Sequence, residues 1–159
     1  YGDTFGLSED IKRDLLSILL VLEKQEWKNS GVFNQIRKVL EWVMKFCNKI
    51  GLSPVVFSGT NLTECSMFLG NVAMSEFVPL HIQRSFHSAV SIANDGSHRL
   101  SIDSIITNGE APYLIRSTTF ELLNIINWLK TFSIDEMDVL ERSVQTKKIY
   151  NKIDQNKNK

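Results

Sequence analysis

The middle of the chain decides the predicted fold, and from residue 86 to residue 106 it reads FHSAVSIANDGSHRLSIDSII. Apolar residues take alternate, even-numbered positions on both sides of a turn signal, Asn94-Asp95-Gly96. These residues are Phe86, Val90 and Ile92 before the turn, and Leu100, Ile102 and Ile106 after it. A period of two is typical of a strand with one buried face. The stretch therefore predicts a β-hairpin with one apolar side.

The turn also sets an expected register for this hairpin. Even-numbered residues face each other only if the loop holds an odd number of residues, and a three-residue turn with a left-handed glycine meets that condition. Val90 then faces Leu100, and His87 faces Asp103. A second turn signal precedes Tyr113-Leu114-Ile115, which predicts a third antiparallel strand.

Helical patterns flank the hairpin on its N-terminal side. Apolar residues recur at helical spacing over residues 8–28 and again over residues 32–50. Gly51 stands where a helix commonly ends in a left-handed residue. The short break between the two stretches predicts an antiparallel helical hairpin. A capping-box spacing from Asn61 to Glu64 indicates a further short helix.

Two more helices are predicted on the C-terminal side, because Thr118 with Glu121 and Ser133 with Glu136 repeat the capping-box spacing. The last of these helices is the more polar one. Its apolar residues are Met137, Leu140 and Val144.

The predicted fold class is α+β, with an N-terminal helical hairpin, a central antiparallel β-meander and two C-terminal helices packed on one sheet face. No linker or internal repeat interrupts residues 1–146, which are predicted to form a single domain. Residues 147–159 carry five lysines against Asp154 alone. Such an Asn/Lys-rich end predicts a basic, disordered tail.

Composition narrows the class of protein further. The 159 residues are 43% hydrophobic and 23% charged, as expected of one globular domain. Lysine plus arginine and aspartate plus glutamate both number 18, so no whole-chain charge attracts nucleic acid or an anionic membrane. No apolar run approaches the roughly 18 residues of a membrane span.

The two cysteines bear on the compartment. Cys47 lies on a helical apolar stripe, so Cys47 and Cys65 are interpreted as free thiols of an intracellular protein, cytoplasmic or nuclear. Asn61-Leu62-Thr63 matches the glycosylation pattern, but no other feature indicates secretion.

Motifs with a chemical mechanism are missing from the sequence. It contains no glycine-rich phosphate loop, no GxSxG, no HExxH and no CxxC. No catalytic residue, metal ligand or cofactor is therefore predicted. His87 opposite Asp103 is the one pair that suggests a small hydrolase-type enzyme, and a cross-strand charge pair on a solvated sheet face is the preferred explanation of it.

The leading hypothesis is a non-catalytic protein-interaction or self-association domain, of the accessory or matrix-like kind, viral or otherwise. This hypothesis rests on apolar surface beyond what one core would cover, because the predicted helix over residues 119–132 is apolar on nearly all sides. A flat strand face of small and polar residues is a second candidate surface. The predicted partner-binding residues are Trp27, Ser91, Arg99, Ser101 and Trp128.

The main alternative is nucleic-acid binding through the basic end of the chain. Its predicted residues are Arg142, Lys147, Lys148 and Lys152, with Lys12 and Arg13 as additional candidates. Backbone phosphates would then dominate the affinity and make it fall steeply with salt.

Overall fold

The computed structural model describes residues 13, 32–59, 61–97 and 111–157. Within these ranges the chain forms five α-helices and a short 3-10 helix, and no residue lies in a strand. In chain order the elements are α2 (Val32–Lys49), α3 (Leu62–Leu69), η3 (Val72–Met74), α4 (Leu80–Ser97), α6 (Ala111–Leu129) and α7 (Glu136–Lys157).

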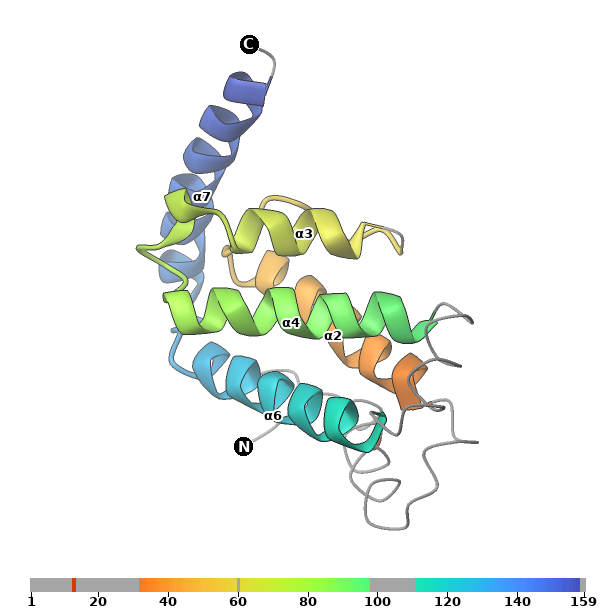
Figure 1. Ribbon diagram of the computed structural model, residues 1–159. Coiled ribbons are helices and arrows are strands. Elements are labelled where there is room, and N and C mark those ends of the chain that lie inside the picture. Colours follow the sequence, from red (N-terminus) through yellow and green to blue (C-terminus); the bar gives the residue numbers. More distant parts are fainter. Residues whose placement is uncertain (1–12, 14–31, 60, 98–110, 158–159) are drawn as a thin grey trace.

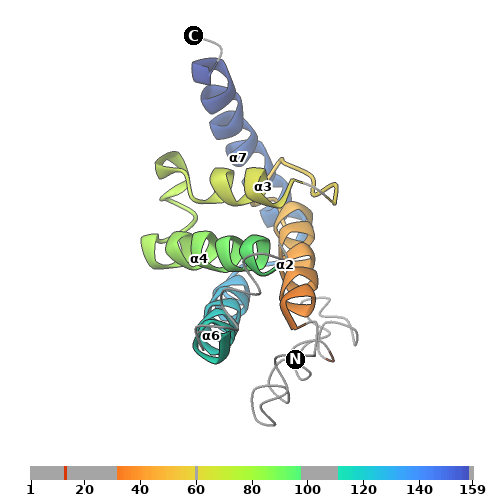
Figure 2. The same ribbon diagram turned by 45° about the vertical axis from the view of Figure 1, so that its right-hand side comes forward.

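Helix α4 is the centre of the arrangement. It lies between α3 and α6, and α2 crosses it on a third side (Figures 1 and 2). Helix α7 stands at one end of this group, and its C-terminal half projects past α3 (Figure 1). The chain is therefore a helical cluster around α4 with one long helix at its edge.

The sequence of α4 explains its central position. The helix begins directly after Pro79, a residue that favours the first turn of a helix. Buried apolar residues then recur every three or four positions, so that they form one helical stripe. They are Ile82, Phe86, Ala89, Val90 and Ala93. The alanines keep this stripe narrow enough for neighbouring helices to approach closely.

This helix shows that the predicted α+β fold is wrong. Residues 86–97, expected to form a strand and its turn, belong to α4, so His87 and Val90 have no cross-strand neighbours. The prediction counted only large apolar residues and placed Ala89 on a polar face, although Ala89 is fully buried. Counted together, Phe86, Ala89, Val90 and Ala93 have a helical period. The second predicted strand, from residue 98 onward, lies outside the described residues.

The predicted third strand is also wrong, because Tyr113-Leu114-Ile115 lies in the first turns of α6. The helix thus starts several residues before Thr118, which is buried in its interior instead of capping its end. The structure accordingly contains no β-meander over the described part of residues 85–116, and helices replace the expected sheet.

Two helices predicted on the N-terminal side, over residues 32–50 and after Asn61, are present in the structure. Helix α2 spans almost the whole predicted stretch, and Gly51 after it has a φ of 84°, the left-handed conformation that was expected. The predicted helix over residues 8–28 lies outside the described residues. Helix α3 is present, but the Asn61 side chain bonds the backbone of Val56 and Ser58 and forms no cap.

The predicted division into a domain and a tail at residue 147 stays a prediction. Helix α7 continues without a break across that position to Lys157. Residues of the expected tail therefore belong to the same helix as Met137 and Leu140.

Candidate functional site

The base of α7 is fastened to the end of α2 by polar contacts. Arg142 donates from Nε to the carbonyl of Ile50 at 3.0 Å, and the buried Thr146 hydroxyl donates to the carbonyl of Gly51 at 2.9 Å. These two carbonyls belong to the turn that directly follows α2, whose last residue is Lys49. Side chains of α7 therefore donate hydrogen bonds to this turn.

Arg142 has further contacts that hold it in place. Its guanidinium also donates to the carbonyl of Ser133 and lies 5.2 Å from the centre of the Phe132 ring. Burial lowers the pKa of this guanidinium, and the Asp138 carboxylate acts in the opposite direction. Arg142 thus joins α7 to the loop before it.

Farther along the same face of α7, apolar side chains rest on the cluster. Ile149, Tyr150 and Ile153 are half-buried and pack against the core. The Tyr150 ring meets the Phe68 ring of α3 edge-on, with centroids 5.7 Å apart. One face of α7 is therefore covered along most of its length.

The opposite face of α7 is open. Met137, Leu140 and Val144 are 71%, 60% and 49% exposed. Successive helix residues are about 100° apart, so these three lie on one side of the helix and Thr146 lies on the other. They border a shallow hollow of about 470 Å³ together with Glu141, Gln145 and Lys148. Met137, Leu140 and Val144 are called the outer stripe below.

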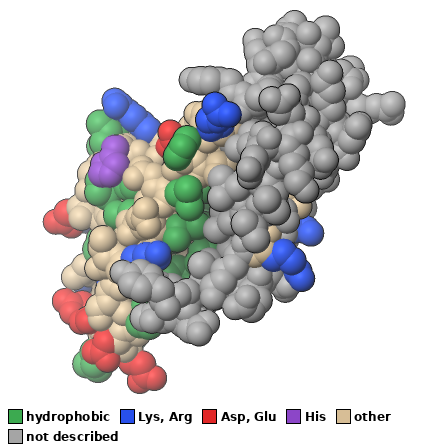
Figure 3. Space-filling model, turned by 90° about the horizontal axis from the view of Figure 1, so that it is seen from below, with side chains coloured by type: hydrophobic (Ala, Val, Ile, Leu, Met, Phe, Trp, Pro, Cys, Tyr) green, Lys and Arg blue, Asp and Glu red, His purple; other side chains and the backbone are tan. Residues whose placement is uncertain are grey.

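Charge is distributed unevenly along α7. The first half carries the acidic residues Glu136, Asp138 and Glu141 with Arg142, and the second half carries four lysines, Lys147, Lys148, Lys152 and Lys157, with Asp154. On the face seen from below, most of the visible acidic side chains lie toward one edge of the molecule (Figure 3). Helix α7 therefore has an acidic half and a basic half on either side of Val144.

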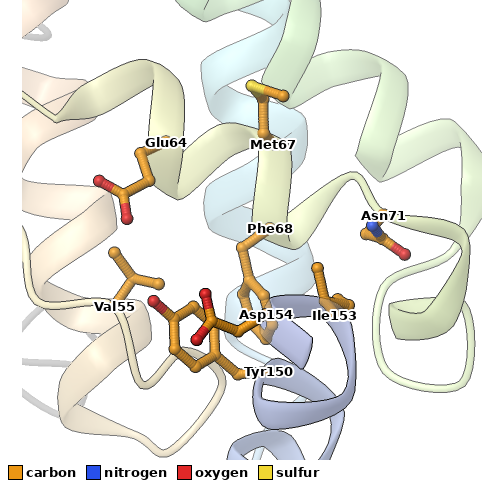
Figure 4. Close-up of a pocket in the computed structure, with 8 residues that line it drawn as sticks. All are labelled: Val55, Glu64, Met67, Phe68, Asn71, Tyr150, Ile153 and Asp154. Atoms are coloured by element: carbon orange, nitrogen blue, oxygen red, sulfur yellow. The ribbon is translucent and has the colours of Figure 1, made fainter. Parts of the chain in front are cut away.

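A pocket of about 290 Å³ lies where α7 meets α3. Its wall is apolar and aromatic, from Phe68, Ile153 and Tyr150, and the Glu64 and Asp154 carboxylates stand at its rim from the two different helices (Figure 4). Such a lining favours an apolar group with a positive charge at its end.

Two of the five predicted partner-binding residues, Ser91 and Trp128, lie in the part of the chain that the structure describes, and the predicted site stays a prediction. Trp27, Arg99 and Ser101 lie outside the described residues. Ser91 is exposed on α4. Trp128 is half-buried, with its ring edge-on to Phe86 at 6.2 Å and to Phe132 at 5.0 Å, so its ring packs within the cluster.

The predicted nucleic-acid residues divide in two. Lys147, Lys148 and Lys152 are exposed on α7, whereas Arg142 is occupied by the carbonyls of Ile50 and Ser133. Nucleic-acid binding through the lysines stays a prediction. In the predicted hydrolase pair, the Nδ1 atom of His87 lies 3.4 Å from the hydroxyl oxygen of Ser66. Asp103, the other member of the pair, lies outside the described residues.

Over the described residues, no three His, Cys, Asp or Glu side chains are grouped as metal ligands. Among the described helices, none is both long and apolar enough to cross a membrane. Cys47 and Cys65 are both buried and unpaired, which confirms the prediction of free thiols.

Comparison with known proteins found no matching family model, no similar curated protein and no similar solved structure.

The outer stripe is the surface that the sequence left unrecognised. Met137, Leu140 and Val144 were noted as the apolar positions of the last helix, and their expected place was against a sheet. The signal that could have corrected this is the second set of apolar residues in α7, Ile149, Tyr150 and Ile153, which lies on a different side of the helix.

Proposed function

We propose that this chain is a non-catalytic protein-interaction domain whose contact surface is the outer stripe of α7. The observation that carries the proposal is that three large apolar side chains stay exposed on one helix face whose opposite face is already packed. Single exposed apolar residues are ordinary on protein surfaces, but a row of them on one face marks a binding site.

The shape of the surface supports the same proposal. The stripe follows the spacing i, i+3 and i+7, the pattern by which helices pack side by side. Charged residues border it, as at the rim of a protein interface. Over the described residues no three His, Cys, Asp or Glu side chains form a cluster that could hold a metal ion, and the stripe itself offers apolar contact.

A substitution in the centre of the stripe tests the proposal. We expect Leu140→Asp to weaken association by about tenfold or more, because a carboxylate would have to be desolvated at the contact. Leu80→Asp is the matched control, since Leu80 and Leu140 are both 60% exposed and lie in different helices. Neither change should alter the free energy of unfolding by more than about 0.5 kcal/mol.

Two measurements on the full chain are needed: light scattering over a concentration series, and retention of proteins on the immobilised chain. Association that is lost in Leu140→Asp and kept in Leu80→Asp supports the proposal. If the unaltered chain neither self-associates nor retains any protein that Leu140→Asp fails to retain, the proposal is wrong.

A further inference from the structure

We infer that the partner of the outer stripe is a second copy of this chain, bound through two antiparallel α7 helices. The inference rests on the proposed function and identifies its partner. It is carried by the charges that flank the stripe, which discriminate between a parallel and an antiparallel arrangement.

The charges fall on two flanks of the stripe, and on each flank a glutamate precedes a lysine, with Asp154 following Lys147 on one of them. With about 100° between successive residues, Glu136 and Lys147 lie on one flank, and Glu141 and Lys148 lie on the other. A two-fold axis brings the same flank of both helices together with their directions reversed. Glutamate therefore meets lysine on both flanks, whereas parallel helices would oppose like charges.

The register of this pairing follows from the apolar residues. If the two-fold axis passes beside Ser143, Leu140 of one copy lies next to Val144 of the other, so the apolar contact is centred on the axis. Glu136 then lies within one helical turn of the second copy's Lys147, and Glu141 within one turn of its Lys148. Apolar contact and charge pairing are satisfied by the same register.

These four charges also lack the usual partners within their own helix. None of them has an opposite charge three or four residues away, the spacing that stabilises an isolated helix. Instead, Glu141 follows Asp138 by three residues and Lys148 precedes Lys152 by four, so like charges are adjacent. Within the fold, Lys148 borders a hollow that also contains Glu76 of the segment after η3. A second α7 would supply opposite charge to both flanks.

Charge reversal is the first test, by sedimentation equilibrium of the full chain. Three apolar side chains per copy make a small contact, so we expect a dissociation constant of roughly micromolar size. Glu141→Lys alone and Lys148→Glu alone should each raise it by about tenfold, since each change acts twice across the axis. The double variant Glu141→Lys/Lys148→Glu should restore it to within about threefold. Failure of the double variant to recover would overturn the antiparallel pairing.

Disulfide formation between copies is the second test and reports direction. A mixture of Met137→Cys and Asn151→Cys variants should form a mixed disulfide, because these residues face each other only across antiparallel helices. Preferential formation of Met137→Cys homodimers would instead show parallel pairing. The natural thiols stay out of the reaction because Cys47 and Cys65 are buried, and burial raises the pKa of Cys65 to about 11, with the Glu64 carboxylate adding to the rise.

The two proposals fail in different ways. A monomeric chain that still retains another protein, but not after Leu140→Asp, overturns the second-copy inference and leaves the proposed function standing. A monomeric chain that retains nothing through the outer stripe overturns both.

Discussion

Helices α4 and α7 are attached to the molecule in opposite ways. Helix α4 lies among three other helices and is held by apolar contacts, with Phe86 and Ile82 fully buried. Helix α7 lies at the edge and is fastened at its base by Arg142 and Thr146, which bond carbonyls at the end of α2. In the central helix α4, apolar periodicity alone identifies the buried face. In the peripheral helix α7, polar contacts also help to determine which face is buried.

The largest effect should come from the centre of α4. Phe86→Ala removes a fully buried ring that meets Trp128 edge-on, and we expect it to lower the free energy of unfolding by about 3–5 kcal/mol. Urea denaturation measures this, with Leu80→Ala as the control in the exposed first turn of the same helix. A loss below about 1 kcal/mol would contradict the central position of α4.

A smaller loss is expected where α7 meets α2. Gly51 has a left-handed backbone, and a Cβ added to it would lie 2.4 Å from the carbonyl oxygen of Val139. Gly51→Ala should therefore cost about 1–2 kcal/mol for the backbone and more for the displacement of α7. Gly59 has a φ of 88° with nothing near its Cβ position, so Gly59→Ala measures the backbone cost alone. Equal losses for the two variants in thermal denaturation would mean that α7 does not press on residue 51.

The smallest effect should come from a single hydrogen bond at the base of α7. Thr146→Val keeps the shape of the side chain but leaves the Gly51 carbonyl without its donor, at an expected cost of about 1–2 kcal/mol. Thr131→Val removes an exposed hydroxyl bond to the Trp128 carbonyl and should cost less than about 0.5 kcal/mol. If both variants unfold at the same urea concentration as the unaltered chain, apolar packing alone holds α7.

The sequence predicted those helices whose large apolar residues fall on one stripe. Helix α2 is the clearest case. Gly51 indicates its end because glycine, without a Cβ, adopts the left-handed conformation that often follows a helix. Helix α4 was missed because Ala89 and Ala93 carry little apolar surface and were read as part of a polar face, while Asn94-Asp95-Gly96 imitates a turn. A small residue such as Ala89 is buried where a neighbouring helix approaches closely, and the sequence alone does not show where that happens.

The outer stripe of α7 could be predicted only in part. Its apolar residues are visible in the sequence, but their exposure depends on which face of α7 is used for packing. Ile149, Tyr150 and Ile153 contribute to that choice through apolar contacts, and Arg142 and Thr146 contribute by bonding carbonyls of residues 50 and 51, more than 90 positions earlier in the chain. Spacing within a helix carries no information about such distant partners.

Gly51 has a consequence for the comparison of variants of this sequence. No side chain fits between residue 51 and the backbone of α7 at Val139 and Ser143. Any variant with another amino acid at this position must therefore hold α7 elsewhere, or not hold it at all. A glycine at position 51, in the turn after α2, therefore indicates that α7 packs against this turn.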